Sequence, residues 1–446
     1  MKEKKSLTKN AFYLGIGTFI AKLLGAIYRV PLTNIIGGYG LGLYQMVFPV
    51  YCLLLDFSGA GLPSALSKII SSKNDSNKGE VYLRTSIKLY SIIGLILTLF
   101  MGIFSKQISV LQGDKNAFLS YLTLSPSILL VCLISSFRGY FQGQLNMKPT
   151  AVSQILEQIV KLFLGLILCK IFMPNVVLAV ASATFSISIS EVIALLFLYF
   201  IYKRKNGNKL NIRKKGFDGA KEIIKLSIPI TLIGIVLPLS QVVDSFLIVN
   251  LLKRYTTRAT SLYGIYSGVV LTIINLPVSI CYGISTSLIP AVSGAKSSKD
   301  KEKSIKQGLI LTLILSFLAF LFCFFFSKNI LKILFRSLTE EQLIVSNKLL
   351  KICSSGILFL SLLQSINGIL IGKGKTYSIL TGMVFGAIVK VILNIILLNN
   401  PKINIFGAGV SLIACYFCSV LINLIIVIKK DKPNAVKEFT NRQNQN

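Results

Sequence analysis

Charged residues lie inside long apolar stretches of this 446-residue chain, and they are its main candidates for binding chemistry. Lys22 and Arg29 are seven residues apart and therefore share one face of a helix. A charge at the centre of a bilayer costs about 2.5–3.5 kcal/mol, so such side chains are expected to face the protein interior or a water-filled cavity. The pattern favours a transport site, and ion pairs that only hold helices together are the alternative.

Two carboxylates lie next to residues that interrupt helices. Asp56 precedes a stretch that contains glycine and proline (residues 59–63), and Asp244 follows Pro229 and Pro238. Broken helices at matching places in the two halves of a transporter typically mark its binding site. Both carboxylates are therefore added to the predicted cavity site.

A second polar group falls on one face of an otherwise apolar helix, which is expected over residues 150–172. Its members recur at i, i+3, i+4 and i+7, and they are Gln154, Glu157, Gln158 and Lys161. Glu157 precedes Lys161 by four residues, which is the favourable order for an ion pair within a helix. A stripe that contacts substrate and a structural pair that satisfies itself both remain open.

Other polar residues in or beside apolar segments have no obvious partner. Arg138 flanks the turn before this helix and is expected to extend toward lipid headgroups. Glu191 lies in the next apolar segment, and Lys390 and Asn394 lie in a later one. The sequence assigns no partner to these three residues.

Membrane-spanning helices must position all of these residues. The chain is 53% hydrophobic and only 14% charged, whereas about a quarter of the residues of a soluble domain are charged. Apolar runs of about 18 or more residues recur along its whole length, which predicts an all-α polytopic membrane protein. Twelve spans are expected, at residues 10–36, 41–69, 84–104, 118–141, 150–172, 176–202, 222–252, 260–291, 305–327, 343–372, 376–398 and 404–428.

The net charge of +32 would suggest a nucleic-acid partner in a soluble protein. Here the basic residues cluster in short loops between apolar runs, so membrane lipids are the expected partner and nucleic acid is not. Most Lys and Arg residues fall in the N-terminus, the even-numbered loops and the tail. We therefore expect a multi-pass protein of the cytoplasmic membrane with both termini in the cytoplasm.

An internal repeat organises the chain into two lobes. A basic loop (203–221) separates an N-terminal six-helix lobe (1–202) from a C-terminal one (222–428), and a tail follows (429–446). A shift of 229 residues aligns six residues without a gap: Ser136, Gly139, Gly143, Ile159, Val160 and Lys161 fall on Ser365, Gly368, Gly372, Ile388, Val389 and Lys390. Because six is an even number, each lobe enters the membrane in the same orientation, as in transporters with parallel repeats.

The sequence offers no catalytic or metal-binding constellation. It contains no His, which excludes His-based catalysis and metal ligation by His. IGKGKT (371–376) lacks the first glycine of a phosphate-binding loop, and TEEQ (339–342) predicts a helix capping box. We expect no cofactor and no ATP site, so transport must draw on an ion gradient, the membrane potential or the substrate gradient.

Several segments carry a family resemblance. They are YRVPLTNIIGGYGLGLYQMVFPVY (28–51), AGLPSALSKIIS (60–71), RGYFQGQLNMKPTAVSQILEQIVK (138–161) and NLPVSICYGISTSLIPAVSGA (275–295). The chain resembles the stage V sporulation protein B group of the multidrug/oligosaccharidyl-lipid/polysaccharide flippase superfamily over most of its length. The motif of Arg138, Gly139 and Gly143, followed by SQ-x-x-EQ, is the most specific part.

The resemblance implies two pseudo-symmetric lobes around a central cavity. It also implies translocation of an undecaprenyl-diphosphate-linked cell-wall precursor, lipid II above all, for peptidoglycan synthesis in spore formation. Lys22 and Arg29 match basic positions of the first helix of the family, and Arg29 resembles a cavity arginine that engages a diphosphate. The lipid II flippase branch has further arginines on its second and eighth helices, and here the eighth-helix position is Thr272. That branch has two further C-terminal helices, for which this sequence is expected to have no counterpart.

Two other functions are alternatives to this one. An ion-coupled drug or cation antiporter of the same fold would rely on intramembrane acids, for which Asp56 and Asp244 are the candidates. A membrane glycosyltransferase or polymerase would need carboxylates on the outer side, where only Asp114, Glu340 and Glu341 are available. The favoured expectation is a monomeric flippase, not an enzyme, whose substrate is a lipid-linked oligosaccharide.

Overall fold

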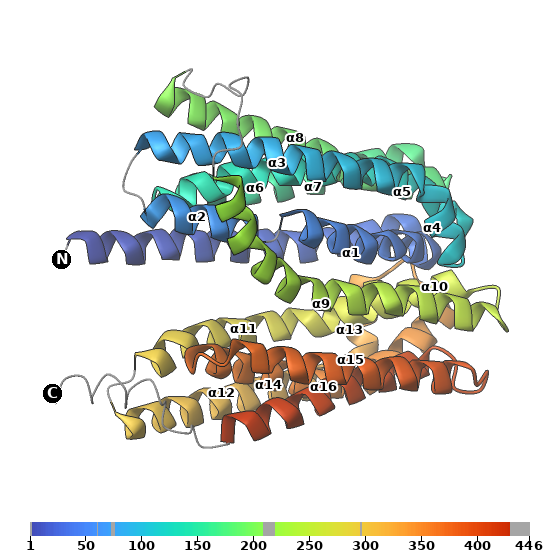
Figure 1. Cartoon of the computed structure of the whole chain (residues 1–446). Helices are drawn as coiled ribbons and strands as arrows, with labels where there is room; N and C mark the ends of the chain where they lie inside the picture. Colours follow the sequence, from blue (N-terminus) through green and yellow to red (C-terminus); the bar gives the residue numbers. More distant parts are fainter. Residues whose placement is uncertain (1, 60, 73–75, 208–218, 295–296, 429–446) are drawn as a thin grey trace. The chain divides into compact units, whose positions relative to one another are not determined.

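Figure 1 shows the computed structural model of the chain, which describes residues 2–59, 61–72, 76–207, 219–294 and 297–428. Every regular element in this part is a helix, which confirms the predicted all-α fold class. The Lys22 side chain, most of the predicted linker (208–218) and the predicted tail (429–446) lie outside the described residues.

Long helices form most of the fold. They are α1 (Lys2–Gly59), α3 (Ser76–Ile103), α7 (Lys148–Phe172), α8 (Val176–Asn206), α9 (Ala220–Lys253), α11 (Leu271–Ser293), α12 (Ser298–Phe325), α14 (Glu340–Gly372), α15 (Thr376–Leu398) and α16 (Phe406–Ile428). Shorter elements connect them, namely α2 (Leu62–Ser72), α4 (Ser105–Leu111), η1 (Lys115–Ala117), α5 (Phe118–Leu124), α6 (Pro126–Gly143), α10 (Ala259–Gly264), η2 (Ile265–Val270) and α13 (Ser327–Leu334).

Two interruptions near the N-terminus lie where the sequence predicts them. The expected spans 10–36 and 41–69 meet at Gly37, whose φ of 65° kinks α1 in a conformation that favours glycine. After Asp56, α1 ends at Gly59 and α2 begins at Leu62. The glycine- and proline-containing stretch thus ends one helix and begins another.

The corresponding part of the second half differs from expectation. Pro229 and Pro238 do not break α9, which runs as one helix past both prolines and bends along its length (Figure 1). The interruption comes later instead, in η2, a stretch of π-helix between α10 and α11. π-Helical segments are rare in proteins, and those that occur are often found at functional sites. This one ends immediately before Leu271 and Thr272.

Within the described residues, ten helices are long and apolar enough to cross a membrane. Residues 23–71 count once among them because the two expected spans there are joined through the kink. The 25-residue α7 is not among the ten. The polytopic character is therefore clear, and the number of twelve spans stays a prediction.

The paired glycines of the internal repeat have the same structural role in both halves. A Cβ on Gly139 of α6 would lie 3.0 Å from Pro63 Cα of α2, and one on Gly143 would lie 2.7 Å from Ile70 Cβ. On α14, a Cβ on Gly368 would lie 2.5 Å from the Ser285 carbonyl oxygen of α11. Glycine lets two helix backbones approach closely in a membrane, so this motif joins α6 to α2 and α14 to α11.

The chain divides into two compact units. Unit 1 comprises Met1–Ile273, Phe326–Ile352 and Leu393–Gly409, and unit 2 comprises Ile274–Phe325, Cys353–Ile392 and Val410–Asn446. A buried hydrophobic cluster of unit 1 draws residues from α2, α3, α6 and α8, and one of unit 2 draws them from α11, α14, α15 and α16. The division into lobes at residues 202 and 222 stays a prediction.

Candidate functional site

Arg29 of α1 is a half-buried cation near the kink of that helix. Its Nη1 donates a hydrogen bond to Thr272 Oγ1 at 3.1 Å, and the Thr272 hydroxyl in turn donates to the Gly268 carbonyl oxygen at 2.6 Å. The structure therefore brings together the two residues that the resemblance had assigned to the first and eighth helices. The π-helical segment that contains Gly268 positions Thr272 for this contact.

The guanidinium of Arg29 has spare hydrogen-bonding capacity. It carries five N–H donors, and in the described part of the chain Thr272 is the one acceptor that it contacts. A planar guanidinium with free donors can bind two oxygens of a phosphate or carboxylate at once. Arg29 is thus chemically able to bind an anionic group.

Asp56 is half-buried near the end of α1. None of the described side chains forms an ion pair or a hydrogen bond with its carboxylate, and this includes Arg29. A contact between Lys22 and Asp56 lies outside the described structure, because the Lys22 side chain is not part of it. The grouping of Lys22, Arg29 and Asp56 in one cavity site stays a prediction.

Asp244 has a partner that the sequence did not suggest. Asn394 Nδ2 of α15 donates to Asp244 Oδ1 of α9 at 3.2 Å, and both side chains are buried. Lys390 precedes Asn394 by one turn of α15 and is also buried. None of the described hydrogen bonds links Asp244 to Arg29, so the contacts form two separate groups.

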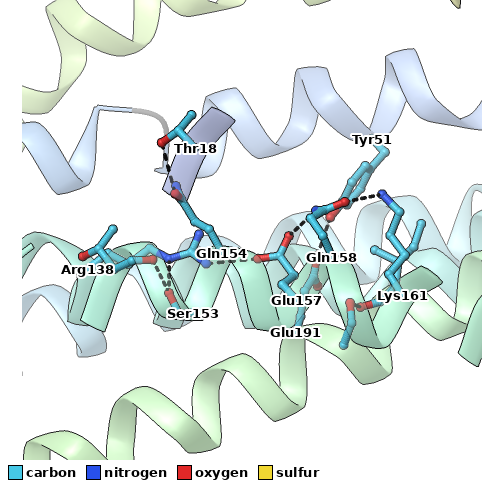
Figure 2. Close-up of polar contacts among 12 residues, drawn as sticks. Thr18, Tyr51, Arg138, Ser153, Gln154, Glu157, Gln158, Lys161 and Glu191 are labelled. Atoms are coloured by element: carbon cyan, nitrogen blue, oxygen red, sulfur yellow. Dashed lines mark hydrogen bonds and ion pairs between the residues drawn. The ribbon is translucent and has the colours of Figure 1, made fainter. Parts of the chain in front are cut away.

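The polar stripe of α7 differs from its expected pairing (Figure 2). Arg138 Nη2 of α6 forms an ion pair with Glu157 Oε2 at 3.0 Å, and Arg138 Nε donates to Ser153 Oγ at 3.0 Å. Arg138, and not Lys161, is therefore the ion-pair partner of Glu157 in the structure. The fixed fork of the guanidinium contacts two turns of α7 at once, which a lysine four residues away on the same helix cannot do.

Lys161 is left with uncharged partners. Its Nζ donates to Gln158 Oε1 at 3.2 Å and lies 5.5 Å from the centre of the Tyr28 ring of α1. Gln158 Nε2 donates to Glu157 Oε1 at 3.3 Å. Arg138 likewise does not extend toward headgroups as expected, because Glu157 and Ser153 hold it. The network runs from α6 along α7 toward α1.

Close helix packing explains why this stripe faces α1. A Cβ on Gly17 of α1 would lie 2.6 Å from Ala151 Cβ of α7, and one on Gly165 of α7 would lie 2.6 Å from Tyr28 Oη. Gln154 Oε1 accepts a hydrogen bond from Thr18 Oγ1 of α1 at 3.2 Å. The stripe therefore lies in an interface inside unit 1, where polar contacts join α1, α6 and α7.

Glu191 is a buried acid to which the sequence assigned no partner. Glu191 of α8 is 2% exposed, and its Oε1 accepts a hydrogen bond from Tyr51 Oη of α1 at 2.8 Å (Figure 2). A lone Glu in an apolar helix of 31 residues was the available signal. Its partner is 140 residues away in the sequence, too far for any local pattern to reveal.

The predicted capping box at Thr339 is confirmed. The backbone N–H of Gln342 donates to Thr339 Oγ1 at 3.3 Å, and the backbone N–H of Thr339 donates to Gln342 Oε1 at 3.3 Å. These residues begin α14, as the pattern indicated. TEEQ is therefore accounted for by helix capping.

Comparison with known families gives two matches. A family model described as "Polysaccharide biosynthesis protein" matches residues 7–295, and one described as "MatE" matches residues 229–396. The first covers well over half of the chain and contains all residues of the Arg29 site and of the α7 stripe.

Curated relatives extend over nearly the whole chain. Stage V sporulation protein B of Bacillus subtilis is 27% identical over 96% of this chain and 84% of its own length. The lipid II flippase MurJ of the same organism is 27% identical over 94% of this chain and 82% of its own length. The multidrug export protein MepA of Staphylococcus aureus is 24% identical over 96% of both chains.

Solved structures show the same fold. An inward-facing multidrug resistance MATE family transporter of the MOP superfamily matches with a TM-score of 0.79 and 14% identity, over 94% of this chain and 97% of the other. The lipid II flippase MurJ in an inward closed conformation matches with a TM-score of 0.76 and 20% identity, over 93% and 87%. At these identities the likeness concerns the arrangement of helices.

Proposed function

We propose a function on the premise that this chain belongs to the polysaccharide biosynthesis protein family and has the fold of MOP-superfamily transporters. The proposed function is to flip a lipid-linked cell-wall precursor across the cytoplasmic membrane. The chain is a multi-pass membrane protein of the transporter and flippase class. The proposed substrate is an undecaprenyl-diphosphate-linked saccharide such as lipid II, and the proposed role is peptidoglycan synthesis for the spore cortex. The names of the relatives support both the substrate and the role.

The contact of Arg29 with Thr272 is the observation that carries this proposal. It joins α1 to the first turn of α11 through a half-buried guanidinium with unused donors. A diphosphate is a dianionic group with several acceptor oxygens, and such groups are bound best by arginine in a partly dry site. In the proposed mechanism Arg29 exchanges Thr272 for a diphosphate oxygen when substrate enters.

The charge balance of the α7 network supports an anionic substrate. Glu157 is neutralised by Arg138, so the stripe does not present a free carboxylate toward α1. Lys161, by contrast, has only Gln158 and the Tyr28 ring as described partners. The region near Arg29 is therefore more cationic than the sequence pattern alone suggested, which favours a phosphate over a cationic drug.

The substrate is proposed to cross the membrane by alternating access. The proposed cavity is lined by Lys22, Arg29, Asp56, Asp244 and Thr272. Both termini are proposed to be cytoplasmic. The protein is proposed to work as a monomer without a cofactor, and an ion gradient or the membrane potential would supply the driving force.

An ion-coupled drug or cation antiporter is the second candidate. The observation in its favour is Asp56, a half-buried carboxylate without an ion-pair partner among the described side chains. Such an acid can bind a proton or a cation inside a membrane. The similarity to a multidrug export protein is consistent with this candidate.

A reconstituted flipping assay separates the two functions. Proteoliposomes containing the full chain would receive fluorescent lipid II or a lipid-linked teichoic-acid precursor, and a cationic dye would be tested in parallel. We expect rapid exposure of lipid II on the opposite leaflet and no gradient-driven dye transport. Dye transport without lipid flipping would overturn the proposed function, and a preference for the teichoic-acid precursor would replace lipid II as the substrate.

A further inference from the structure

Glu191 is the buried titratable group that the proposed binding site does not use. It lies in the middle of α8 and is 2% exposed. Tyr51 Oη donates to its Oε1 at 2.8 Å, whereas its Oε2 is buried and has no hydrogen-bond partner within the described structure. A buried carboxylate oxygen without a donor is unfavourable, so this half of the carboxyl group requires an explanation.

The groups around Glu191 do not include a bonded cation. The Ser127 hydroxyl of α6 faces it but donates to the Leu124 carbonyl oxygen at 2.8 Å, and the Cys132 thiol of the same helix is nearby. From α7, the charges of Glu157 and Lys161 act on it. The guanidinium of Arg138, the other cation of the network, is committed to Glu157 and Ser153.

An ionised Glu191 would therefore be a second negative charge near Glu157 without a salt bridge of its own. Burying such a charge costs several kcal/mol, whereas the neutral acid does not carry that cost. Lys161 is the nearby cation that has no carboxylate bonded to it in the described part of the chain, because Gln158 accepts its hydrogen bond. A change in helix packing that moves Lys161 away from Gln158 would make it available to Glu191.

We propose that Glu191 is a proton-binding carboxyl, which holds a proton in this conformation and releases it when Lys161 becomes its partner. The proton sits on the carboxyl group whose Oε1 accepts from Tyr51, and on release the negative charge is balanced by the Lys161 ammonium. This proposal rests on the proposed function only where it links proton release to lipid flipping. The site itself lies in unit 1, apart from the contacts of Arg29 with Thr272.

Infrared difference spectroscopy tests the site independently of transport. The full chain in lipid nanodiscs would be titrated with acid after carboxyl-¹³C labelling of glutamate, which distinguishes glutamate bands from those of aspartates such as Asp56. We expect a protonated-carboxyl band that shifts with the label and is missing in the Glu191→Gln variant. Asp56→Asn is the matched control and should keep the band. A band of unchanged amplitude in Glu191→Gln would overturn the proposal.

Two further variants test the neighbours and keep the proposal falsifiable if Glu191→Gln does not fold. Tyr51→Phe removes a hydrogen bond that stabilises the ionised carboxylate, so the midpoint of the band should move to higher pH by about one unit. Lys161→Gln removes the proposed counter-charge and should move it in the same direction. An unchanged midpoint in both variants would contradict the assignment.

The link to transport is measured separately. In proteoliposomes with an imposed pH gradient, the initial rate of lipid II flipping by the wild-type chain should depend on pH across the midpoint of the band. The Glu191→Gln variant should lose that dependence. If the chain does not flip lipid II at all, the proposed function fails, while the infrared band still decides whether Glu191 binds a proton.

Discussion

At the scale of single residues, Arg138 is the side chain whose observed contacts differ most from those expected from the sequence. Its sequence position beside a turn suggested contact with lipid headgroups, but its guanidinium is held by Glu157 and Ser153 of α7. The spacing of Glu157 and Lys161 correctly identified a polar face of α7. The spacing did not identify the partners, because a pattern within one helix contains no information about Arg138 on the neighbouring helix α6. The same limit applies to Tyr51 with Glu191 and to Asn394 with Asp244.

The ion pair of Arg138 and Glu157 predicts a specific pattern of stability. The two side chains are only 15% and 21% exposed, so Arg138→Gln leaves an uncompensated carboxylate and should cost about 3 kcal/mol. The melting temperature in detergent should fall by several degrees. Replacing both residues, as in Arg138→Gln with Glu157→Gln, should recover part of that loss.

Lys170→Gln serves as the control for this pair, because Lys170 is an exposed basic residue of the same helix. It should leave the melting temperature unchanged. Equal melting temperatures for Arg138→Gln and the wild-type chain would show that the pair does not stabilise the fold.

At the scale of elements, the sequence predicted where helices lie better than how they are interrupted. The apolar runs located the long helices, and Gly37 and the residues after Asp56 mark real interruptions of α1. Pro229 and Pro238 did not break α9, because a membrane helix can absorb proline by bending. The π-helical segment before Thr272 has no sequence signature of its own. It depends on packing, since Gly264 and Gly268 lie against α1 residues Gly38, Leu41 and Gly42.

The repeated glycines predict matched losses in the two halves. Gly143→Ala places a Cβ 2.7 Å from Ile70 Cβ, and Gly372→Ala, at the matching position of the repeat, places one 2.9 Å from Val292 Cβ. Each variant must push two helices apart, so each should cost about 1–3 kcal/mol and lower the melting temperature. Gly283→Ala is the control, since a Cβ there meets nothing within 4 Å. If all three variants melt alike, close glycine packing does not support the repeat.

At the scale of the whole molecule, composition was enough to establish an all-helical, polytopic membrane protein. The motifs then identified a family whose membership the comparisons confirm. The sequence did not reveal which distant segments of unit 1 pack against each other. Within unit 1, segments near residues 111–116 contact the later segments 245–260: Lys253 Nζ donates to the Gly113 carbonyl oxygen at 2.7 Å, and Thr260 Oγ1 donates to Asp114 Oδ2 at 2.8 Å. Such contacts between distant segments follow from the packed fold alone.

If the predicted lobes 1–202 and 222–428 are the bodies that move in the proposed alternating access, these contacts between residues 113–114 and residues 253–260 must separate during transport. A chain with Asp114→Cys and Thr260→Cys should form a disulfide on oxidation, because the side chains that it replaces are in hydrogen-bond contact. Lipid flipping should stop when the disulfide forms and return when it is reduced. Either cysteine alone should respond to neither treatment. Full flipping by the cross-linked double variant would contradict a mechanism in which this contact opens.

The central claim is that Arg29 binds the diphosphate of the substrate, and the initial rate of lipid II flipping by Arg29→Ala in proteoliposomes tests it most directly. Loss of a charge-assisted contact should lower that rate roughly tenfold or more, whereas Arg29→Lys should retain part of it because the charge remains. Arg204→Ala, which removes an exposed arginine of α8, should flip at the wild-type rate. An Arg29→Ala chain that reconstitutes normally and flips lipid II at the wild-type rate would contradict the account.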